Sequence, residues 1–228
     1  MTTSRQMLTV HHLNTAQSER IIWLLEELEL PYELRLYQRD LVTQLAPPQL
    51  RLVHPLGSVP VLCDGDLTLA ESGAIVEYVL GRYGNGQLTV PVTSSQYPHY
   101  LYWFHYANGS LMTQLGVNWI ATMVAGSGSN SPLLSSLRER LERHLQMVDE
   151  RLSQATYFAG DEFTAADIMM HFPFGTMKAF YNVGQAERPN IKAWLARISD
   201  RPGYQRAMKA AGHEHDPALD WGATRSAF

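Results

Sequence analysis

The sequence has little of three things, and each shortage excludes a class of protein. It contains a single cysteine, Cys63, so no disulfide can form within the chain and no cysteine-based metal site is available. Lysine and arginine total only 18 against 22 acidic residues, a formal net charge of -4 that does not suit a nucleic-acid binder. No apolar run approaches the ~18 residues needed to cross a bilayer. We therefore expect a cytoplasmic protein with no metal, no membrane segment and no nucleic-acid partner.

The patterning of the chain predicts two domains of different kinds. Residues 7–83 alternate between strand-like and helix-like segments in the order β-α-β-α-β-β-α. A polar stretch with two prolines follows, and the rest of the chain shows helical periodicity, most clearly from residue 137 to residue 152. The prediction is an α/β domain over residues 1–84, a linker over 85–97, and an all-α helical bundle over 98–228.

Two local patterns in the first domain carry further expectations. Asn14 and Gln17 have the spacing of an N-cap and its reciprocal partner before the first predicted helix. Two strand-like runs flank Asp64-Gly65, which predicts a β-hairpin. Pro60 lies inside the first of these runs. Because proline cannot donate a hydrogen bond to a ladder, that strand lies at a sheet edge or the proline marks a special backbone feature.

Four stretches of the chain together resemble the soluble glutathione transferases over nearly its whole length. They are residues 13–33, His54–Leu62 (HPLGSVPVL), Leu69–Ile75 (LAESGAI) and Tyr157–Asp167 (YFAGDEFTAAD). Each is weak alone, but all four occur in order at the expected spacing. The resemblance implies a thioredoxin-like βαβαββα domain followed by a C-terminal all-helical domain, glutathione as co-substrate, and a homodimer.

The resemblance places the peptide backbone of glutathione against the residue before a cis-proline, which here is Val59 before Pro60. An extended peptide can pair with a strand in this way. A trans proline is the other interpretation, because most X-Pro bonds are trans. Ser58 falls where many relatives carry lysine, so Gln44 and His54 are further candidates for the glycyl end.

Glu71 and Ser72 directly precede a predicted helix. The free N–H groups of a helix N-terminus and a serine hydroxyl suit the γ-glutamyl carboxylate, and Glu71 suits the ammonium group. An ordinary N-cap explains Ser72 equally well but gives Glu71 no role. We therefore predict that both residues bind glutathione.

The residue that activates the thiol is missing from its expected place. The resemblance implies a serine at the start of the first helix, and that position is Ala16, whose methyl group cannot donate a hydrogen bond. Thr15 falls where a nu-like bacterial disulfide-reductase branch carries a threonine near the sulfur, and Ser18 and Asn14 are the other candidates. Helix capping explains Thr15 and Ser18 as well as catalysis does.

An aromatic segment in the second domain is the candidate substrate pocket. Most of the segment must belong to the core. The family places its apolar substrate site here, and aromatic and methionine side chains suit an adaptable electrophile site. The candidate residues are Tyr102, Tyr106, Ser110 and Met112.

Three other features are expected to be structural. Cys63 lies in an apolar strand run and is expected to be a buried, inert thiol. His213 and His215 form a pair without a second ligand cluster, so a solvated tail is preferred to a metal site. Thr164 and Asp167 have capping-box spacing and are expected to begin a helix.

Three functions remain open from the sequence. The first is a glutathione transferase that adds the thiol to hydrophobic electrophiles or reduces peroxides. The second is a glutathione-dependent disulfide reductase, favoured by Thr15. The third is a non-catalytic glutathione-binding protein with a regulatory or stress role, favoured by Ala16, since fold alone does not fix function.

Overall fold

The structure, a computed structural model, describes residues 7–40, 42–126, 129, 131–179, 181 and 187–213. The chain forms two compact units. The first contains the described residues of Met1–Leu88 and of Ser199–Pro217, and the second those of Thr89–Ile198. The predicted fold class is confirmed, with a four-stranded sheet and helices in one unit and a helical second unit. The predicted helical domain included everything after residue 98, whereas the structure groups residues 199–213 with the first unit.

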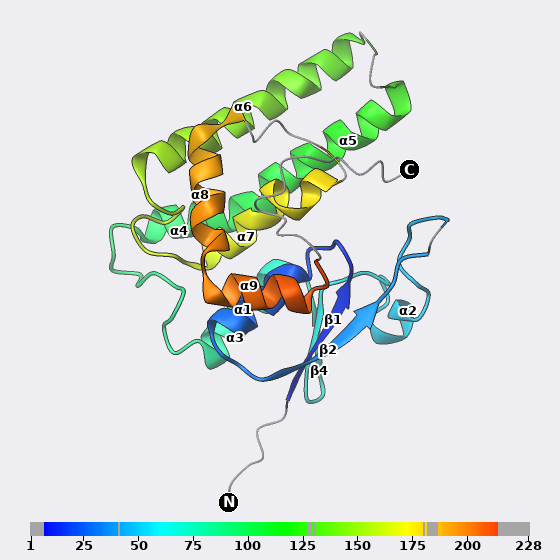
Figure 1. Ribbon diagram of the computed structural model, residues 1–228, viewed down its shortest axis with the longest axis vertical. Coiled ribbons are helices and arrows are strands. Elements are labelled where there is room, and N and C mark those ends of the chain that lie inside the picture. The colour runs from blue at the N-terminus through cyan, green and yellow to red at the C-terminus, as the bar shows by residue number, and fades with distance from the viewer. Residues whose placement is uncertain are drawn as a thin grey trace, which may run out of the picture. The chain divides into compact units, whose positions relative to one another are not determined.

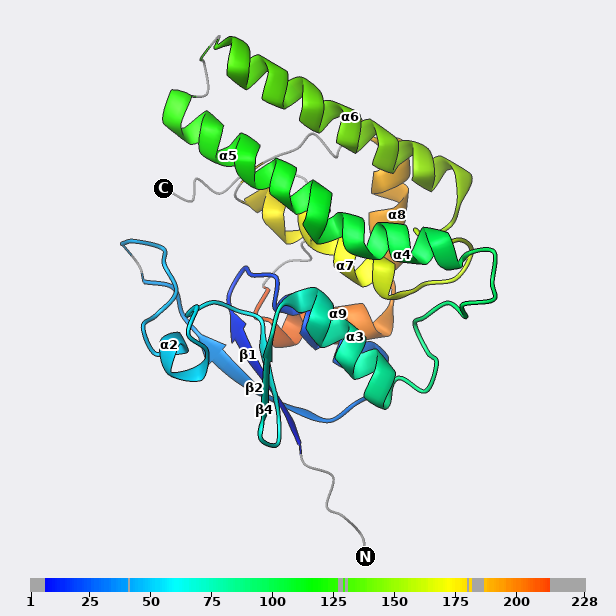
Figure 2. The ribbon, with the colours of Figure 1, turned by 180° about the vertical axis from the view of Figure 1, so that it is seen from behind.

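The first unit is a mixed sheet with helices against it (Figures 1 and 2). The sheet order is β2-β1-β3-β4, with β1 and β2 parallel and the other pairs antiparallel. Helices α1 and α3 pack against the sheet and against each other, and α9 lies along α1. The elements of this unit are β1 (Leu8–Leu13), α1 (Glu19–Glu27), β2 (Tyr32–Tyr37), α2 (Leu50–Val53), β3 (Val61–Asp64), β4 (Leu67–Ala70), α3 (Ser72–Tyr83) and α9 (Pro202–Ala210).

The two local patterns of this unit have different outcomes. The hairpin is confirmed, with β3 and β4 joined at Gly65 and Asp66. Strand β3 is interior, so the edge-strand interpretation of Pro60 is wrong; the proline precedes the strand and follows a cis peptide bond. The cap at Asn14 is also wrong, because α1 begins only at Glu19 and its first turns are closed by main-chain bonds such as Glu19 N–H to the Ala16 carbonyl.

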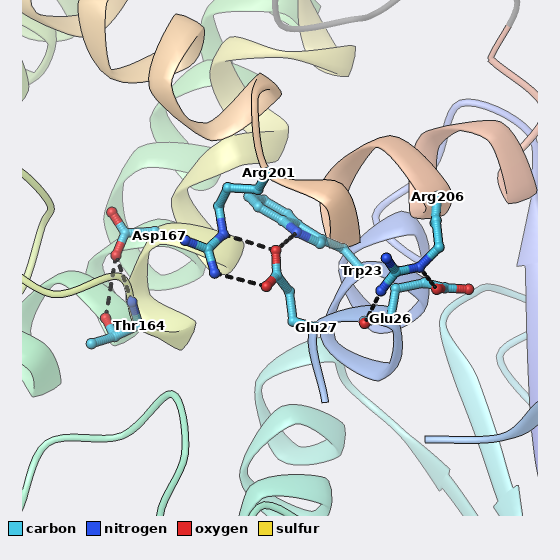
Figure 3. A network of polar contacts seen from close by, with 7 residues as sticks. All are labelled: Trp23, Glu26, Glu27, Thr164, Asp167, Arg201 and Arg206. Carbon is cyan, nitrogen blue, oxygen red and sulfur yellow. Dashed lines mark hydrogen bonds and ion pairs between the residues drawn. The ribbon is translucent and has the colours of Figure 1, made fainter. Parts of the chain in front are cut away.

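Two Arg–Glu pairs hold α9 against α1 (Figure 3). Arg201 donates from Nε and Nη2 to the Glu27 carboxylate at 2.9 and 2.8 Å, and Trp23 Nε1 donates to the same carboxylate at 2.9 Å. Arg206 donates to the side chain and to the carbonyl of Glu26, both at 2.7 Å. Partners about 175 residues apart in sequence therefore complete the first unit.

The regular elements in the described part of the second unit are all helical. The expected stripe on α6 is confirmed from Leu141 onward, since Leu141, Leu145, Val148 and Leu152 are buried along one face, while Leu137 is half-buried. None of the described helices is long and apolar enough to span a membrane. The elements are α4 (Tyr97–Tyr106), a π-helical turn η1 (Ala107–Met112), α5 (Thr113–Ala125), α6 (Pro132–Gln154), α7 (Ala165–Phe174), a 3-10 turn η2 (Thr176–Ala179) and α8 (Pro189–Ser199).

The capping box at the start of α7 is confirmed and extends further than its two residues. The buried Asp167 carboxylate accepts hydrogen bonds from the Thr164 N–H, the Thr164 hydroxyl, the Phe158 N–H and Trp194 Nε1, all within 3.3 Å. Figure 3 shows the Thr164 contacts. Burial raises the pKa of Asp167 to about 6, and the four donors oppose that rise. One carboxylate thus ties α7 to α8 and to the loop before α7.

Candidate functional site

Four strand ends meet at one end of the sheet, and the predicted glutathione residues follow or precede them. The last residue of β1, Leu13, pairs with the last residue of β2, Tyr37. His11 of β1 pairs with Val61 at the start of β3, and Val61 pairs with Ala70 at the end of β4. The loop after β1, the segment before β3 and the start of α3 therefore lie beside one another.

The loop after β1 carries Thr15. Its backbone has φ 55°, in the left-handed region, and its side chain is half-buried. The Thr15 hydroxyl makes no hydrogen bond with any residue in the described part of the chain, so it is available to a ligand. Asn14 donates from its amide to Gln38 Oε1 at 3.4 Å, and Ala16 is buried.

Ser18 is not available to donate a hydrogen bond to a thiol. Its side chain is fully buried and bonded to His12 Nδ1 at 2.8 Å, while His12 Nε2 lies 3.1 Å from the Ala211 carbonyl. A carbonyl oxygen can only accept, so Nε2 donates to it, and burial lowers the pKa of His12 and keeps the ring neutral. The neutral ring then accepts at Nδ1 from the Ser18 hydroxyl. The expectation that Ser18 could activate a thiol is not supported, because its proton is already donated.

Arg39, just beyond β2, is a part of this site that the sequence did not reveal. Its guanidinium donates from Nε to the Asn14 carbonyl at 3.2 Å, from Nη2 to the Thr15 carbonyl at 3.1 Å, and from Nη1 to the Gln44 carbonyl at 3.0 Å. Partial burial lowers the pKa of Arg39. One side chain thus connects the loop after β1 with the loop before α2.

The segment before β3 has the geometry that the family resemblance implies. The Val59–Pro60 peptide bond is cis, which confirms that expectation. Val59 is half-buried and precedes the paired residues of β3, which begin at Val61, so it takes no part in the strand register. Ser58 is exposed, and His54 and Gln44 are half-buried.

The start of α3 combines a strained residue with a buried cation. Glu71 is exposed and has φ 70° and ψ 115°, a backbone conformation that non-glycine residues rarely adopt and that concentrates at functional sites. Ser72 is buried, and its hydroxyl accepts from Arg20 Nη1 at 3.3 Å. Ser72 is the first helical residue and Glu71 the N-cap, so the interpretation of Ser72 as an ordinary N-cap is wrong.

Arg20 strengthens the positive character of this helix end. The side chain is fully buried, and burial lowers its pKa to about 9 while the neighbouring Glu19 opposes that shift. The guanidinium remains charged near neutral pH at that value. The first helix therefore places a cation beside the Ser72 hydroxyl at the start of α3, which favours an anion there.

The four candidate pocket residues belong to the second unit. Tyr106 is buried, and its hydroxyl lies 2.5 Å from His144 Nδ1 of α6. Tyr102 stacks on Tyr106 and is 49 % exposed. Ser110 and Met112 lie in the π-helical turn and are half-buried. Such turns occur frequently at functional sites. The substrate pocket stays a prediction.

Cys63 differs from its expected state. Its side chain is half-buried rather than buried, and Sγ lies 3.7 Å from His11 Nε2 on the neighbouring strand. His11 Nδ1 is in turn 2.8 Å from the Tyr37 hydroxyl. Among the residues that the structure describes, no group of three or more potential metal ligands occurs. His215 lies outside these residues, and the described His213 bonds to the buried Glu19 at 3.0 Å.

Comparison with known families decides the affiliation of the chain. The glutathione S-transferase N-terminal domain matches residues 6–81, and the glutathione S-transferase C-terminal domain matches residues 117–202. The chain belongs to the glutathione S-transferase family.

Individual members of the glutathione S-transferase family are similar over most of their length. Glutathione S-transferase 3 of Schizosaccharomyces pombe is 33 % identical over 217 residues, which cover 89 % of this chain and 87 % of that protein. Glutathione S-transferase GstB of Escherichia coli K12 is 28 % identical, over 86 % of this chain and 94 % of its own. The crystal structure of a glutathione S-transferase from Actinobacillus pleuropneumoniae has a TM-score of 0.81 and 33 % identity, covering 90 % and 93 % of the two chains.

Proposed function

We propose that this chain is a glutathione transferase that binds glutathione at the end of the sheet where the four strands meet. It would add the thiol to hydrophobic electrophiles or use it to reduce peroxides, in the cytoplasm. The observation that carries the proposal is the convergence of the free Thr15 hydroxyl, the cis Val59–Pro60 segment and the strained Glu71 with its buried neighbour Ser72.

Each end of glutathione has a matching group in this site. The γ-glutamyl carboxylate meets the first N–H groups of α3 and the Ser72 hydroxyl, with the Arg20 cation behind them. The exposed Glu71 carboxylate suits the ammonium group of the same residue. The peptide backbone pairs with Val59. The glycyl carboxylate lies toward Gln44, His54 or Ser58.

Thr15 is our candidate for activation of the thiol. A free thiol has a pKa of about 8.5, so a donor that stabilises the thiolate increases the reactive fraction at neutral pH. The Thr15 hydroxyl is free to donate, and the Asn14 amide is a second donor in the same loop. The thiolate attacks the electrophilic carbon, a C–S bond forms, the leaving group departs with its electron pair, and the thiol proton passes to solvent.

The same free hydroxyl supports a second candidate function. A thiolate stabilised by Thr15 can also attack a disulfide, forming a new S–S bond and releasing the other thiolate. Turnover of an aromatic halide with glutathione, compared with turnover of a small mixed disulfide, separates transferase from reductase. Tyr102, Tyr106, Ser110 and Met112 are the proposed apolar substrate residues.

We further propose that the protein is a homodimer. Val117, Ile120 and Val124 lie on one face of α5 at helical spacing and are 44 %, 58 % and 84 % exposed. An exposed apolar face of this kind marks an interaction surface. Light scattering after size-exclusion chromatography is expected to give a dimer for the wild type and a monomer for Ile120→Glu, and a monomeric wild type would contradict the proposal.

The test of activation is the ultraviolet absorbance of enzyme-bound thiolate as a function of pH. We expect the bound thiol to ionise well below its free pKa in the wild type. Thr15→Ala is expected to raise that pKa toward the free value, while Thr68→Ala, an exposed threonine on β4, leaves it unchanged. If glutathione binds but its thiol titrates as in water, the protein binds glutathione without activating it.

A further inference from the structure

The bonds of Arg39 join the two loops that our proposed function assigns to opposite ends of glutathione. The carbonyls of Asn14 and Thr15 belong to the loop at the thiol end, and the Gln44 carbonyl belongs to the loop assigned to the glycyl end. All three contacts are 3.0–3.2 Å, within the ordinary range for N–H···O bonds. The three guanidinium nitrogens each hold a different carbonyl.

The backbone at these points needs such support. Thr15 and Gln44 have φ of 55° and 58°, the left-handed region that residues with a side chain seldom adopt. Neither loop belongs to a strand or a helix there, so no ladder holds these carbonyls in place. A rigid planar fork with five donors suits this arrangement, whereas a lysine would offer one ammonium group at a single point.

We propose that Arg39 is a positioning residue, which fixes the Thr15 hydroxyl opposite the thiol and couples that loop to the one that holds the glycyl end of glutathione. This inference rests on the proposed function. Arg39 acts through the main chain of Thr15, so its removal lets the hydroxyl leave the position in which it donates to the sulfur. Misplacement of a catalytic group by about 1 Å can reduce a rate by about 10²-fold.

Arg35, on β2 and four residues before Arg39, provides a matched control. Its side chain is 58 % exposed and pairs at 2.7 Å with Glu33, two residues away. Arg35→Met and Arg39→Met therefore remove the same charge from the same region, but only the second releases the two loops. Arg39→Lys keeps the positive charge but loses the planar guanidinium that bonds to the three carbonyls. This variant therefore separates positioning from a simple electrostatic effect on the thiolate.

The experiment uses the full chain and measures the pKa of the bound thiol together with kcat and KM for glutathione. We expect Arg39→Met to raise the thiol pKa nearly as far as Thr15→Ala does, to lower kcat at least about 10-fold and to raise KM. Arg39→Lys is expected to resemble Arg39→Met, and Arg35→Met to resemble the wild type. The double variant Thr15→Ala/Arg39→Met is expected to show no further rise in thiol pKa beyond Thr15→Ala.

Other results would overturn the inference in distinguishable ways. If Arg39→Met leaves the thiol pKa unchanged while Thr15→Ala raises it, positioning is wrong and the proposed function stands. If the two substitutions are additive, or if Arg39→Lys behaves like the wild type, Arg39 acts by its charge and not through Thr15. If the wild-type thiol titrates as in water, the proposed function fails and the inference with it. Should Arg39→Met not fold, as judged by circular dichroism, Arg39→Lys decides between the same outcomes.

Discussion

The two Arg–Glu pairs between α1 and α9 make a controlled test of how burial determines the strength of an ion pair. Glu27 is 8 % exposed and its partner Arg201 29 %, whereas the Glu26 and Arg206 side chains are 20 % and 48 % exposed. Replacing Arg201 with methionine leaves the Glu27 carboxylate buried. Among the described residues, the hydrogen-bond donor that it keeps is Trp23 Nε1. Removing one partner of a buried pair costs about 3–5 kcal/mol, and the partial exposure of Arg201 places this pair near the lower end.

A loss of about 3 kcal/mol corresponds to a fall in Tm of roughly 6–12 °C for a chain of this size. Arg206→Met removes an equally direct contact, but at the surface, where water replaces the lost partner. We therefore expect its fall in Tm to be about a third of that for Arg201→Met, or less. Thermal unfolding followed by far-ultraviolet circular dichroism measures both variants against the wild type.

Equal falls in Tm for the two variants, or a larger fall for Arg206→Met, would refute this reasoning. Either result would mean that desolvation of the Glu27 carboxylate does not determine the difference. The double variant Glu27→Leu/Arg201→Met provides a second check. It removes both charges from the buried position, so we expect it to be more stable than Arg201→Met alone.

Two further predictions concern other buried positions. The folded-state pKa of Asp167, about 6, exceeds the unfolded value of about 3.9, so its contribution to stability is complete below pH ~4 and is lost as the pH rises through 6. Urea unfolding is therefore expected to show the advantage of the wild type over Asp167→Asn growing by about 1.4 kcal/mol per pH unit between pH 6 and 4, and a constant difference would contradict this. Gly203→Ala is expected to lower Tm although alanine favours helices. Its Cβ would lie 2.7 Å from the carboxyl carbon of Glu27, which cannot move away without losing its bonds to Arg201 and Trp23; a higher Tm would contradict the clash.

The sequence predicted those features whose causes are local along the chain. The order of strands and helices, the β3–β4 hairpin and the α6 stripe follow from the spacing of apolar and turn residues. The cap at Thr164 follows in the same way, because both members of the box lie within four residues. The cis bond at Val59–Pro60 and the position of Glu71–Ser72 at the start of α3 could be predicted because both are short, contiguous patterns, and their binding of glutathione stays a prediction.

Features that depend on distant partners could not be predicted from the same patterns. Arg39 binds main-chain carbonyls, which any residue possesses, so no side-chain pattern marks it. Ser18 was a candidate for activating the thiol because no sequence pattern indicates that His12 bonds to it. Asn14 and Gln17 have the spacing of a cap, but Thr15 between them adopts a left-handed backbone and the helix starts later.

The C-terminal helix α9 belongs to the same unit as the N-terminal sheet, and this affects how the protein can fold during synthesis. The first unit contains described residues up to Leu88 and from Ser199 onward, so its last helix, α9, leaves the ribosome long after its sheet. Until then the Glu27 carboxylate and Trp23 lack the α9 side chains that cover them. The second unit has its described residues within one continuous stretch, so nascent chains are expected to complete it before the first, against the usual N-terminal-first order.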